Sequence, residues 1–119
     1  MADKEVALIV GAGEGLSASL ARLCAKQGMQ VAVAARNPDK LAALCAETGA
    51  TAYACDVIDE TSVDAVFDAV VAEMGVPNLV VYNPSARVRG PIDEIDRDAV
   101  KNAVLITCYG GFVVGQKAA

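Results

Sequence analysis

The chain has 119 residues, of which 55% are apolar and only 4% aromatic, and it carries a net charge of −5 with no histidine. This size and composition predict a single α/β domain over residues 1–119, with a core of small aliphatic side chains. An acidic chain without a basic cluster is a poor nucleic-acid binder. The lack of histidine excludes a Ser-His-Asp triad, a histidine metal site and imidazole catalysis within the chain, and no other metal site is indicated.

The four cysteines indicate a reducing environment. They form no CxxC pair and each lies in an apolar segment, so they are interpreted as small buried hydrophobes with free thiols: Cys24, Cys45, Cys55 and Cys108. The N-terminal segment, with a short first apolar run, fits neither a signal peptide nor a membrane span. A cytoplasmic protein that does not bind membranes is expected.

Residues 5 to about 36 predict a strand, a glycine-rich turn, a helix and a second strand. Val6–Val10 is a continuous apolar run, typical of a strand buried on both faces. The turn Gly11–Gly15 follows directly. The next segment is predicted to be a helix, because its apolar residues recur at helical spacing: Leu16, Leu20, Leu23 and Cys24. Gly28 stands where a helix commonly ends. Residues 31–35 form the second apolar run.

The same alternation continues to residue 82. Asn37-Pro38 indicates a cap and the first residue of a helix that Gly49 closes, with Leu41, Leu44 and Cys45 on its buried side. Residues 51–55 predict a third strand, ending at Asp56. Asp59 is expected to cap a third helix, whose apolar stripe is Val63, Val66, Phe67, Val70, Val71 and Met74, and Gly75 ends it. Residues 79–82 predict a fourth strand. The order β-α-β-α-β-α-β predicts a doubly wound parallel sheet.

The last stretch allows two interpretations. Residues 104–109 and 112–114 flank Gly110-Gly111 and could form a two-residue hairpin. They could instead belong to a helix that begins near Asp96 and uses the glycines for close packing. Propensity alone slightly favours the hairpin, because two glycines weaken a helix by roughly 2 kcal/mol relative to alanine.

The turn after the first strand is the strongest candidate site. A helix that begins at the carboxyl end of a parallel strand directs free N–H groups at the ligand crevice, and glycines let a pyrophosphate approach the backbone. The strict G-x-G-x-x-G pattern fails here, because its sixth position is Leu16; the sequence instead gives Gly11-x-x-x-Gly15-x-Ser17. A phosphate-binding turn is favoured over a merely tight connection.

Three further positions follow strands that end at the same crevice. Arg36 stands where NAD-preferring enzymes usually carry an acidic residue, which favours NADP over NAD, although a solvated arginine is the alternative. Asp56 could accept a hydrogen bond from the adenine amino group or form an Asx turn. Tyr82-Asn83-Pro84-Ser85 lies beside the crevice, or is simply a proline turn. Arg87 and Arg89 could meet an anionic substrate or phosphate, or could be solvated arginines of the loop.

Together these residues resemble the short-chain dehydrogenase/reductase family. The matching positions run in order from Val6 to about Gln116: Gly11-Ala12-Gly13-Glu14-Gly15-Leu16, Ala35-Arg36, Cys55-Asp56-Val57, Tyr82-Asn83-Pro84-Ser85, Gly90-Pro91 and Gly110-Gly111-Phe112. The resemblance implies a Rossmann-like fold and the long-helix interpretation of residues 96–117. It implies that Gly11, Gly13 and Gly15 hold the pyrophosphate, with Glu14 and Leu16 in the same turn. It also implies that Arg36 selects NADP, that Asp56 and Val57 flank adenine, and that Asn83, followed by Pro84 and Ser85, lies near a ribose.

Three motifs and the length depart from the family pattern. Ser17 replaces the last glycine, Tyr82–Ser85 replaces Asn-Asn-Ala-Gly, and Thr107 stands in place of the helix asparagine that supports the proton relay. Family members are about twice as long, and their catalytic Ser and Tyr-x-x-x-Lys lie beyond residue 119. None of the three tyrosines here is followed by lysine four residues later. No catalytic residue is therefore assigned, and the chain is expected to be incompetent by itself.

The resemblance also predicts association. With the sheet truncated after its fourth strand and the following helix, that strand would be an exposed apolar edge. A homo-oligomer, or association through the fourth strand and last helix, is expected. The favoured function is the cofactor-binding portion of an NADP-linked oxidoreductase of unidentified substrate. The alternatives are a non-catalytic nucleotide-binding module and an assembly fragment.

Overall fold

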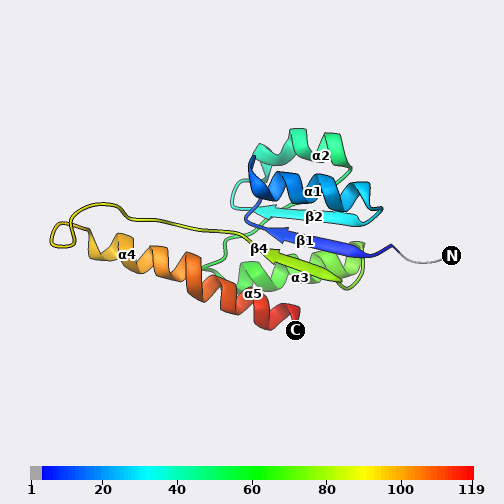
Figure 1. The fold of residues 1–119 in the computed structure, drawn as a ribbon. Coiled ribbons are helices and arrows are strands. Elements are labelled where there is room, and N and C mark those ends of the chain that lie inside the picture. Colours follow the sequence, from blue (N-terminus) through cyan, green and yellow to red (C-terminus); the bar gives the residue numbers. More distant parts are fainter. Residues whose placement is uncertain (1–3) are drawn as a thin grey trace.

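The computed structural model describes residues 4–119 and contains four strands and a series of helices (Figure 1). Residues 1–3, part of the N-terminal segment expected to carry no signal, lie outside the described residues. The strands are β1 (Val6–Val10), β2 (Gln30–Ala35), β3 (Thr51–Ala54) and β4 (Leu79–Tyr82). The helices are α1 (Leu16–Lys26), the 3-10 turn η1 (Pro38–Leu41), α2 (Ala42–Thr48), α3 (Glu60–Glu73), α4 (Arg97–Val104), the π segment η2 (Leu105–Tyr109) and α5 (Gly110–Ala118).

The predicted parallel sheet is confirmed. Its strand order is β3-β2-β1-β4 and every pair is parallel, with Leu8 opposite Ala32 on one side and Val80 on the other. The order reverses between β1 and β4, because β1 pairs with both β2 and β4. In sheets of this type, the crevice at such a reversal is the usual ligand site. Within residues 4–119, β4 is an edge strand.

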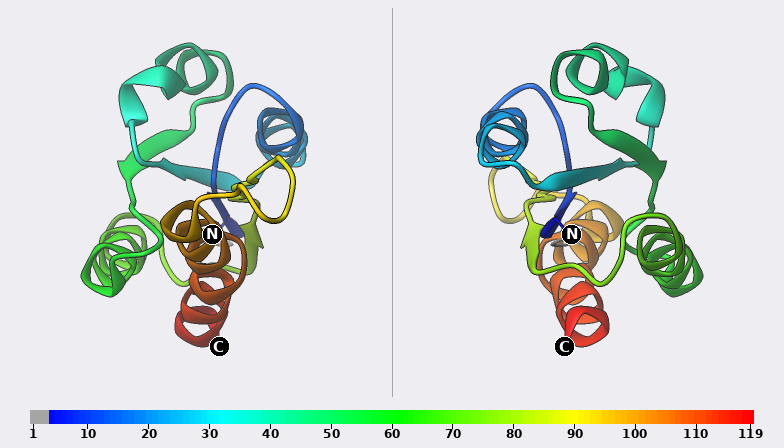
Figure 2. Two further views of the ribbon diagram at one scale, coloured as in Figure 1. Left: turned by 90° about the vertical axis from the view of Figure 1, so that its left-hand side faces the viewer. Right: turned by 90° about the vertical axis from the view of Figure 1, so that its right-hand side faces the viewer.

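Helices cover both faces of the sheet, as alternate residues of a buried strand require (Figure 2). Ala7 and Ile9 of β1 pack with α1 and α2 on one face. Leu8 and Val10 pack with α3 and α5 on the other face. All five residues of β1 are buried, which explains why the strand is a continuous apolar run.

The predicted helix caps are also confirmed. The Asn37 side chain accepts a hydrogen bond from the Asp39 N–H at 3.2 Å. The Asp59 side chain accepts from the Thr61 N–H at 3.0 Å. The long helix was expected to begin near Asp96, and the Asp96 side chain caps it by accepting from the Ala99 N–H at 2.8 Å. These side chains satisfy N–H groups that a helix N-terminus leaves without a partner, so each helix begins where the sequence places its cap.

Some expected side-chain positions are wrong. The buried face of α1 consists of Ser17, Ala18, Ala21 and Cys24, whereas Leu16 is 64% and Leu23 53% exposed. Small residues occupy the contact because α1 lies close against the sheet. Val71 in α3 is exposed rather than part of the buried stripe. The four thiols are free as expected, but Cys108 is exposed and Cys45 half-buried.

The long-helix interpretation that the resemblance implied is confirmed and the hairpin interpretation of residues 104–114 is wrong, because a long helix with one π segment runs through them. The physical reason is the contact that the two glycines make. A Cβ on Gly110 would overlap the Tyr82 hydroxyl and lie 3.2 Å from Val57, and one on Gly111 would lie 3.3 Å from the Tyr82 ring. Close packing against β4 thus outweighs the low helix propensity of glycine.

The loop from Asn83 to Asp96 and helix α4 extend beyond the sheet as an arm (Figure 1). The molecule accordingly measures 60 × 26 × 20 Å along its principal axes. Helix α4 has no buried residue, and Ile92 in the loop is 93% exposed. Among residues 4–119, no helix has both the length and the apolarity needed to cross a membrane.

Candidate nucleotide-binding site

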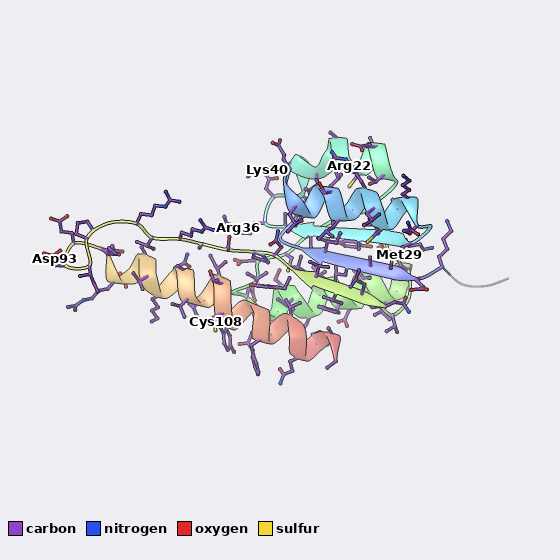
Figure 3. All side chains as sticks on the ribbon, viewed as in Figure 1. Arg22, Met29, Arg36, Lys40, Asp93 and Cys108 are labelled. Atoms are coloured by element: carbon purple, nitrogen blue, oxygen red, sulfur yellow. The ribbon has the colours of Figure 1, made fainter. Side chains whose placement is uncertain are left out.

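A pocket of about 730 Å³ lies at the carboxyl ends of the strands. Residues that follow all four strands line it, and the long helix closes one side. Figure 3 shows Arg36 and Lys40 at this end of the sheet, Met29 at the opposite end and Asp93 at the tip of the arm. The pocket therefore occupies the crevice that the strand order predicts.

The pocket brings together seven of the residues proposed from sequence. They come from the ends of all four strands and the segments after them: Gly11, Arg36, Asp56, Val57, Asn83, Pro84 and Ser85. Four residues of the glycine turn do not line it. Gly13, Glu14, Gly15 and Leu16 are exposed and lie between the pocket residue Ala12 and the first turn of α1.

Gly11 is required by a close approach of two chain segments. Its φ is +87°, and a Cβ there would lie 2.5 Å from the nitrogen of Pro84 and 2.7 Å from its Cδ. The N–H groups of Gly11 and Ala12 both donate to the Ala34 carbonyl, at 2.9 and 3.0 Å. Gly11 therefore joins the turn to β2 and to the segment after β4, and its own N–H is already engaged.

The N–H groups beyond Ala12 are better placed to bind an anion. No backbone hydrogen bond within residues 4–119 engages those of Gly13 and Glu14. The first N–H groups of α1 have no intrahelical partner, and a helix N-terminus favours negative charge. A Cβ on Gly13 or Gly15 would meet no atom within 4 Å. The turn thus leaves space where a phosphate group could approach the backbone.

Ser17 joins the turn to the end of β4. Its side chain is buried, with 1% exposure, and its hydroxyl donates to the Gly11 carbonyl at 3.1 Å. The Asn83 Nδ2 donates to the same Ser17 oxygen at 3.0 Å, while the Asn83 N–H donates to the Val10 carbonyl at 2.9 Å. The residue in place of the third glycine is therefore a hydrogen-bonding link between two walls of the pocket.

Arg36 lies on the pocket at the end of β2, and Lys40 lines it one helical turn later. Neither forms an ion pair with any residue in 4–119. Of the residues around the pocket, Asp56 supplies the single carboxylate. This end of the pocket therefore presents positive charge, which attracts an anionic group.

Asp56 lines the pocket and also forms an Asx turn, the second of the two roles that its sequence position suggested. Its Oδ1 accepts from the Ile58 N–H at 3.2 Å, which is an Asx turn, and its own N–H donates to the Ser62 hydroxyl at 2.9 Å. These bonds fix the carboxylate after β3. They leave Oδ2 of this pocket residue available as an acceptor.

Tyr82 holds the long helix in its π conformation. The Gly110 N–H donates to the Leu105 carbonyl, five residues earlier, so the Ile106 carbonyl loses its α-helical partner. The Tyr82 hydroxyl donates to that carbonyl. Desolvation, with a smaller contribution from Cys55, raises the pKa of Tyr82 to about 12. At neutral pH the Tyr82 hydroxyl is therefore protonated, and its proton is used in the hydrogen bond to the Ile106 carbonyl.

Thr107 anchors the loop that follows β4. Its hydroxyl oxygen accepts from the Ala86 N–H at 3.1 Å and donates to the Ala86 carbonyl at 3.3 Å. Ile106 and Asn102, on the same helix, line the pocket. The threonine that replaces the expected asparagine therefore positions the loop on one side of the pocket.

Several lining residues were not anticipated from sequence. They are Ala12, Asn37, Lys40, Ile58, Ala86, Asn102 and Ile106, together with Ala35 and Cys55. The position of Lys40 could have been predicted from sequence, because Lys40 lies one turn after Asn37, the cap that follows Arg36. Asn102 and Ile106 had none, since their position depends on how the long helix packs against the sheet.

The chain resembles known proteins over nearly its whole length. Residues 5–119 match the family model described as short chain dehydrogenase. D-threitol dehydrogenase of Mycolicibacterium smegmatis is 32% identical over 119 residues, covering 96% of this chain and 46% of the relative. The chain thus spans about half the length of the curated relatives it matches.

Solved structures show the same arrangement of strands and helices. A variant of actinorhodin polyketide ketoreductase solved with NADPH superposes with a TM-score of 0.91 at 28% identity, covering 97% of this chain and 46% of that one. The 3-ketoacyl-(acyl-carrier-protein) reductase from Brucella melitensis, complexed with NADH, gives 0.88 at 24% identity, with 97% and 48% covered. At that identity the second structure supports the fold alone.

Proposed function

Because this chain belongs to the short-chain dehydrogenase family of oxidoreductases, we propose that its pocket binds NADP in preference to NAD. The observation that carries this proposal is Arg36, a guanidinium on the pocket at the end of β2, with Lys40 beside the same pocket. A planar guanidinium can bind a 2′-phosphate through two hydrogen bonds. The segment Ala34–Asn37 carries no carboxylate that would repel the phosphate.

The pocket fits a dinucleotide in other respects. The open space beside Gly13 and Gly15 and the N–H groups at the start of α1 suit a pyrophosphate. Asp56 and Val57 are proposed to flank adenine, with Asn83, Pro84 and Ser85 beside a ribose. When bound, the nicotinamide group carries the hydride, while residues of this chain bind and orient the nucleotide.

We also propose that these residues bind the nucleotide without completing the reaction. Reduction of a carbonyl needs a proton donor with a suitable pKa. The pKa of Tyr82 is about 12 and its hydroxyl is bonded to Ile106. Burial and the Glu73 carboxylate raise the pKa of Tyr53 to about 12 as well. Neither of these tyrosines is therefore proposed as the proton donor of the reaction.

Titration of NADPH and NADH fluorescence tests the cofactor preference. Wild-type protein is expected to bind NADPH more tightly, and Arg36→Asp should weaken NADPH binding about tenfold or more with little effect on NADH, since a charge-assisted hydrogen bond contributes about 1.5–3 kcal/mol. Arg87→Asp is the matched control, because Arg87 is exposed and does not line the pocket. Equal losses for both nucleotides would refute the role of Arg36.

The second candidate is a module that binds a nucleotide but catalyses no reaction. It is favoured by the Tyr82 hydroxyl, whose proton is already hydrogen-bonded to the Ile106 carbonyl. The gene sequence beyond codon 119 separates the two candidates. A reading frame that continues into a Tyr-x-x-x-Lys supports the oxidoreductase, and a stop codon supports the module. A purified chain without saturable NADPH binding up to about 1 mM would contradict both and leave an assembly role.

A further inference from the structure

Ser17 is a buried polar residue at the junction of the glycine turn, helix α1 and the end of β4. Among residues 4–119 it is the one polar side chain in the fully buried class, with 1% exposure. A buried hydroxyl is costly unless it is hydrogen-bonded, and Ser17 makes two hydrogen bonds. Both partners, Gly11 and Asn83, line the pocket.

The chemistry of these partners fixes the direction of each bond. The Gly11 carbonyl can only accept, so the single Ser17 proton must be donated to it. The Ser17 oxygen must then act as an acceptor toward Asn83. A side-chain amide can present either its oxygen or its nitrogen, but only Nδ2 can donate, and it lies 3.0 Å from the Ser17 Oγ.

This chain of bonds sets which end of the Asn83 amide remains free. Nδ2 is bonded to Ser17, and within residues 4–119 no donor engages Oδ1. Asn83 is exposed and lines the pocket. With Nδ2 turned towards Ser17, Oδ1 is the end of the amide that is left without a partner, and the hydroxyl groups of a ribose are donors that suit this acceptor.

We propose that Ser17 is a positioning residue for nucleotide binding, which orients the Asn83 amide so that Oδ1 accepts a hydrogen bond from a ribose hydroxyl. The inference rests on the proposed nucleotide-binding function. Glycine or alanine at position 17 has no hydroxyl, so the Asn83 amide would be free to turn and the Gly11 carbonyl would lose its side-chain partner. The serine thus gives this chain a means of orienting the amide that a glycine does not provide.

A double-mutant cycle on NADPH binding tests the proposal. Ser17→Ala and Asn83→Ala are each expected to raise the dissociation constant about tenfold, the effect of one well-oriented hydrogen bond. The double variant should bind no more weakly than Asn83→Ala alone, because Ser17 acts through Asn83. Ser19→Ala is the control, since Ser19 is exposed on the same helix. Independent, additive losses in the cycle would overturn the positioning role.

A second measurement needs no nucleotide. In 15N-labelled wild-type protein, the Asn83 side-chain proton that bonds Ser17 is expected to exchange with solvent more slowly than the other proton of the same N–H₂ group, and in Ser17→Ala or Ser17→Gly both protons should exchange at the rate of an exposed amide. Fast exchange in the wild type overturns the inference even if NADPH binds. Slow exchange in a protein that does not bind NADPH instead rejects the proposed function and the ribose contact that depends on it.

Discussion

Gly11 lies directly against Pro84, so that a Cβ on Gly11 would come within 2.5 Å of the proline nitrogen. The contact joins the turn after β1 to the segment after β4, on either side of the reversal in strand order. The most constrained glycine of the turn is therefore needed for packing within the protein, whereas Gly13 and Gly15 border open space.

Gly11→Ala should lower the free energy of unfolding by at least about 2 kcal/mol, because it combines a positive φ with steric overlap. Gly13→Ala is the matched control, since its φ is not positive and no atom lies within 4 Å of the added Cβ. It should leave stability within about 0.5 kcal/mol of wild type and weaken NADPH binding. Urea unfolding and NADPH titration measure the two effects, and equal stability losses would contradict the assignment.

Gly110→Ala should destabilise the protein by about 1–3 kcal/mol, because the new Cβ would overlap the Tyr82 hydroxyl and press on Val57. Gly115→Ala, in the same helix but with no atom near the added Cβ, should stabilise it by about 0.5–1 kcal/mol. Thermal unfolding would show shifts of opposite sign. If Gly110→Ala stabilises the protein as Gly115→Ala does, helix propensity rather than packing governs this segment.

Stability should fall at alkaline pH, in part through Tyr82. Its pKa is raised to about 12 in the folded protein, against about 10 when unfolded, so the folded state keeps a proton that the unfolded state releases. The resulting stability is fully present below about pH 10 and is lost as pH rises towards 12. Tyr82→Phe should show a shallower decline, and should cost about 1 kcal/mol at neutral pH through the lost hydrogen bond.

Tyr109→Phe is the control for this measurement. Tyr109 is 40% exposed and stacks on Phe112 with ring centroids 6.1 Å apart. Tyr53, whose pKa is also raised to about 12, is present in every variant, so its contribution cancels. Parallel pH profiles for the wild type and Tyr82→Phe would show that Tyr82 ionises without affecting the fold.

Thiol alkylation should distinguish the exposed cysteine from the buried ones. Cys108 is exposed, whereas Cys55 is 4% exposed and burial raises the pKa of its thiol. Iodoacetamide should therefore modify Cys108 at least about tenfold faster than Cys55 at neutral pH, as judged by peptide mass spectrometry. In 8 M urea, as a denatured control, the difference should disappear. Equal rates in the folded protein would contradict the placement of the long helix.

Self-association remains a proposal, supported by the exposed apolar side chains near β4 and on the long helix. Leu79 is 41% and Phe112 59% exposed. Light scattering across a dilution series should detect oligomers, and Phe112→Glu should shift them towards monomer. Ile92→Glu, at the far tip of the arm, is the control and should have no effect. A monomer at every concentration would reject association.

Local sequence patterns were enough to predict most of the fold. The predicted caps at Asn37 and Asp59 act between residues two apart, and continuous apolar runs require strands covered on both faces. The side of α1 that faces the sheet was not predictable in this way, because close packing selects Ala18 and Ala21 over the larger exposed leucines.

The sequence by itself determined the strand–turn–helix order, the doubly wound sheet and the ends of strands that line the pocket. These follow from the local pattern of apolar residues and from the alternation of strands and helices, which makes neighbouring strands parallel. For residues 104–114 the local pattern left a hairpin and a helix open, and the family resemblance indicated the helix. Only the tertiary structure decided that Gly110 packs on Tyr82, that Gly11 packs on Pro84 and that Ser17 bonds Asn83. These last features join residues far apart in the chain, 66 positions for Ser17 and Asn83 and still more for Gly11 and Pro84, and no local pattern specifies which distant groups will meet when helices and strands pack.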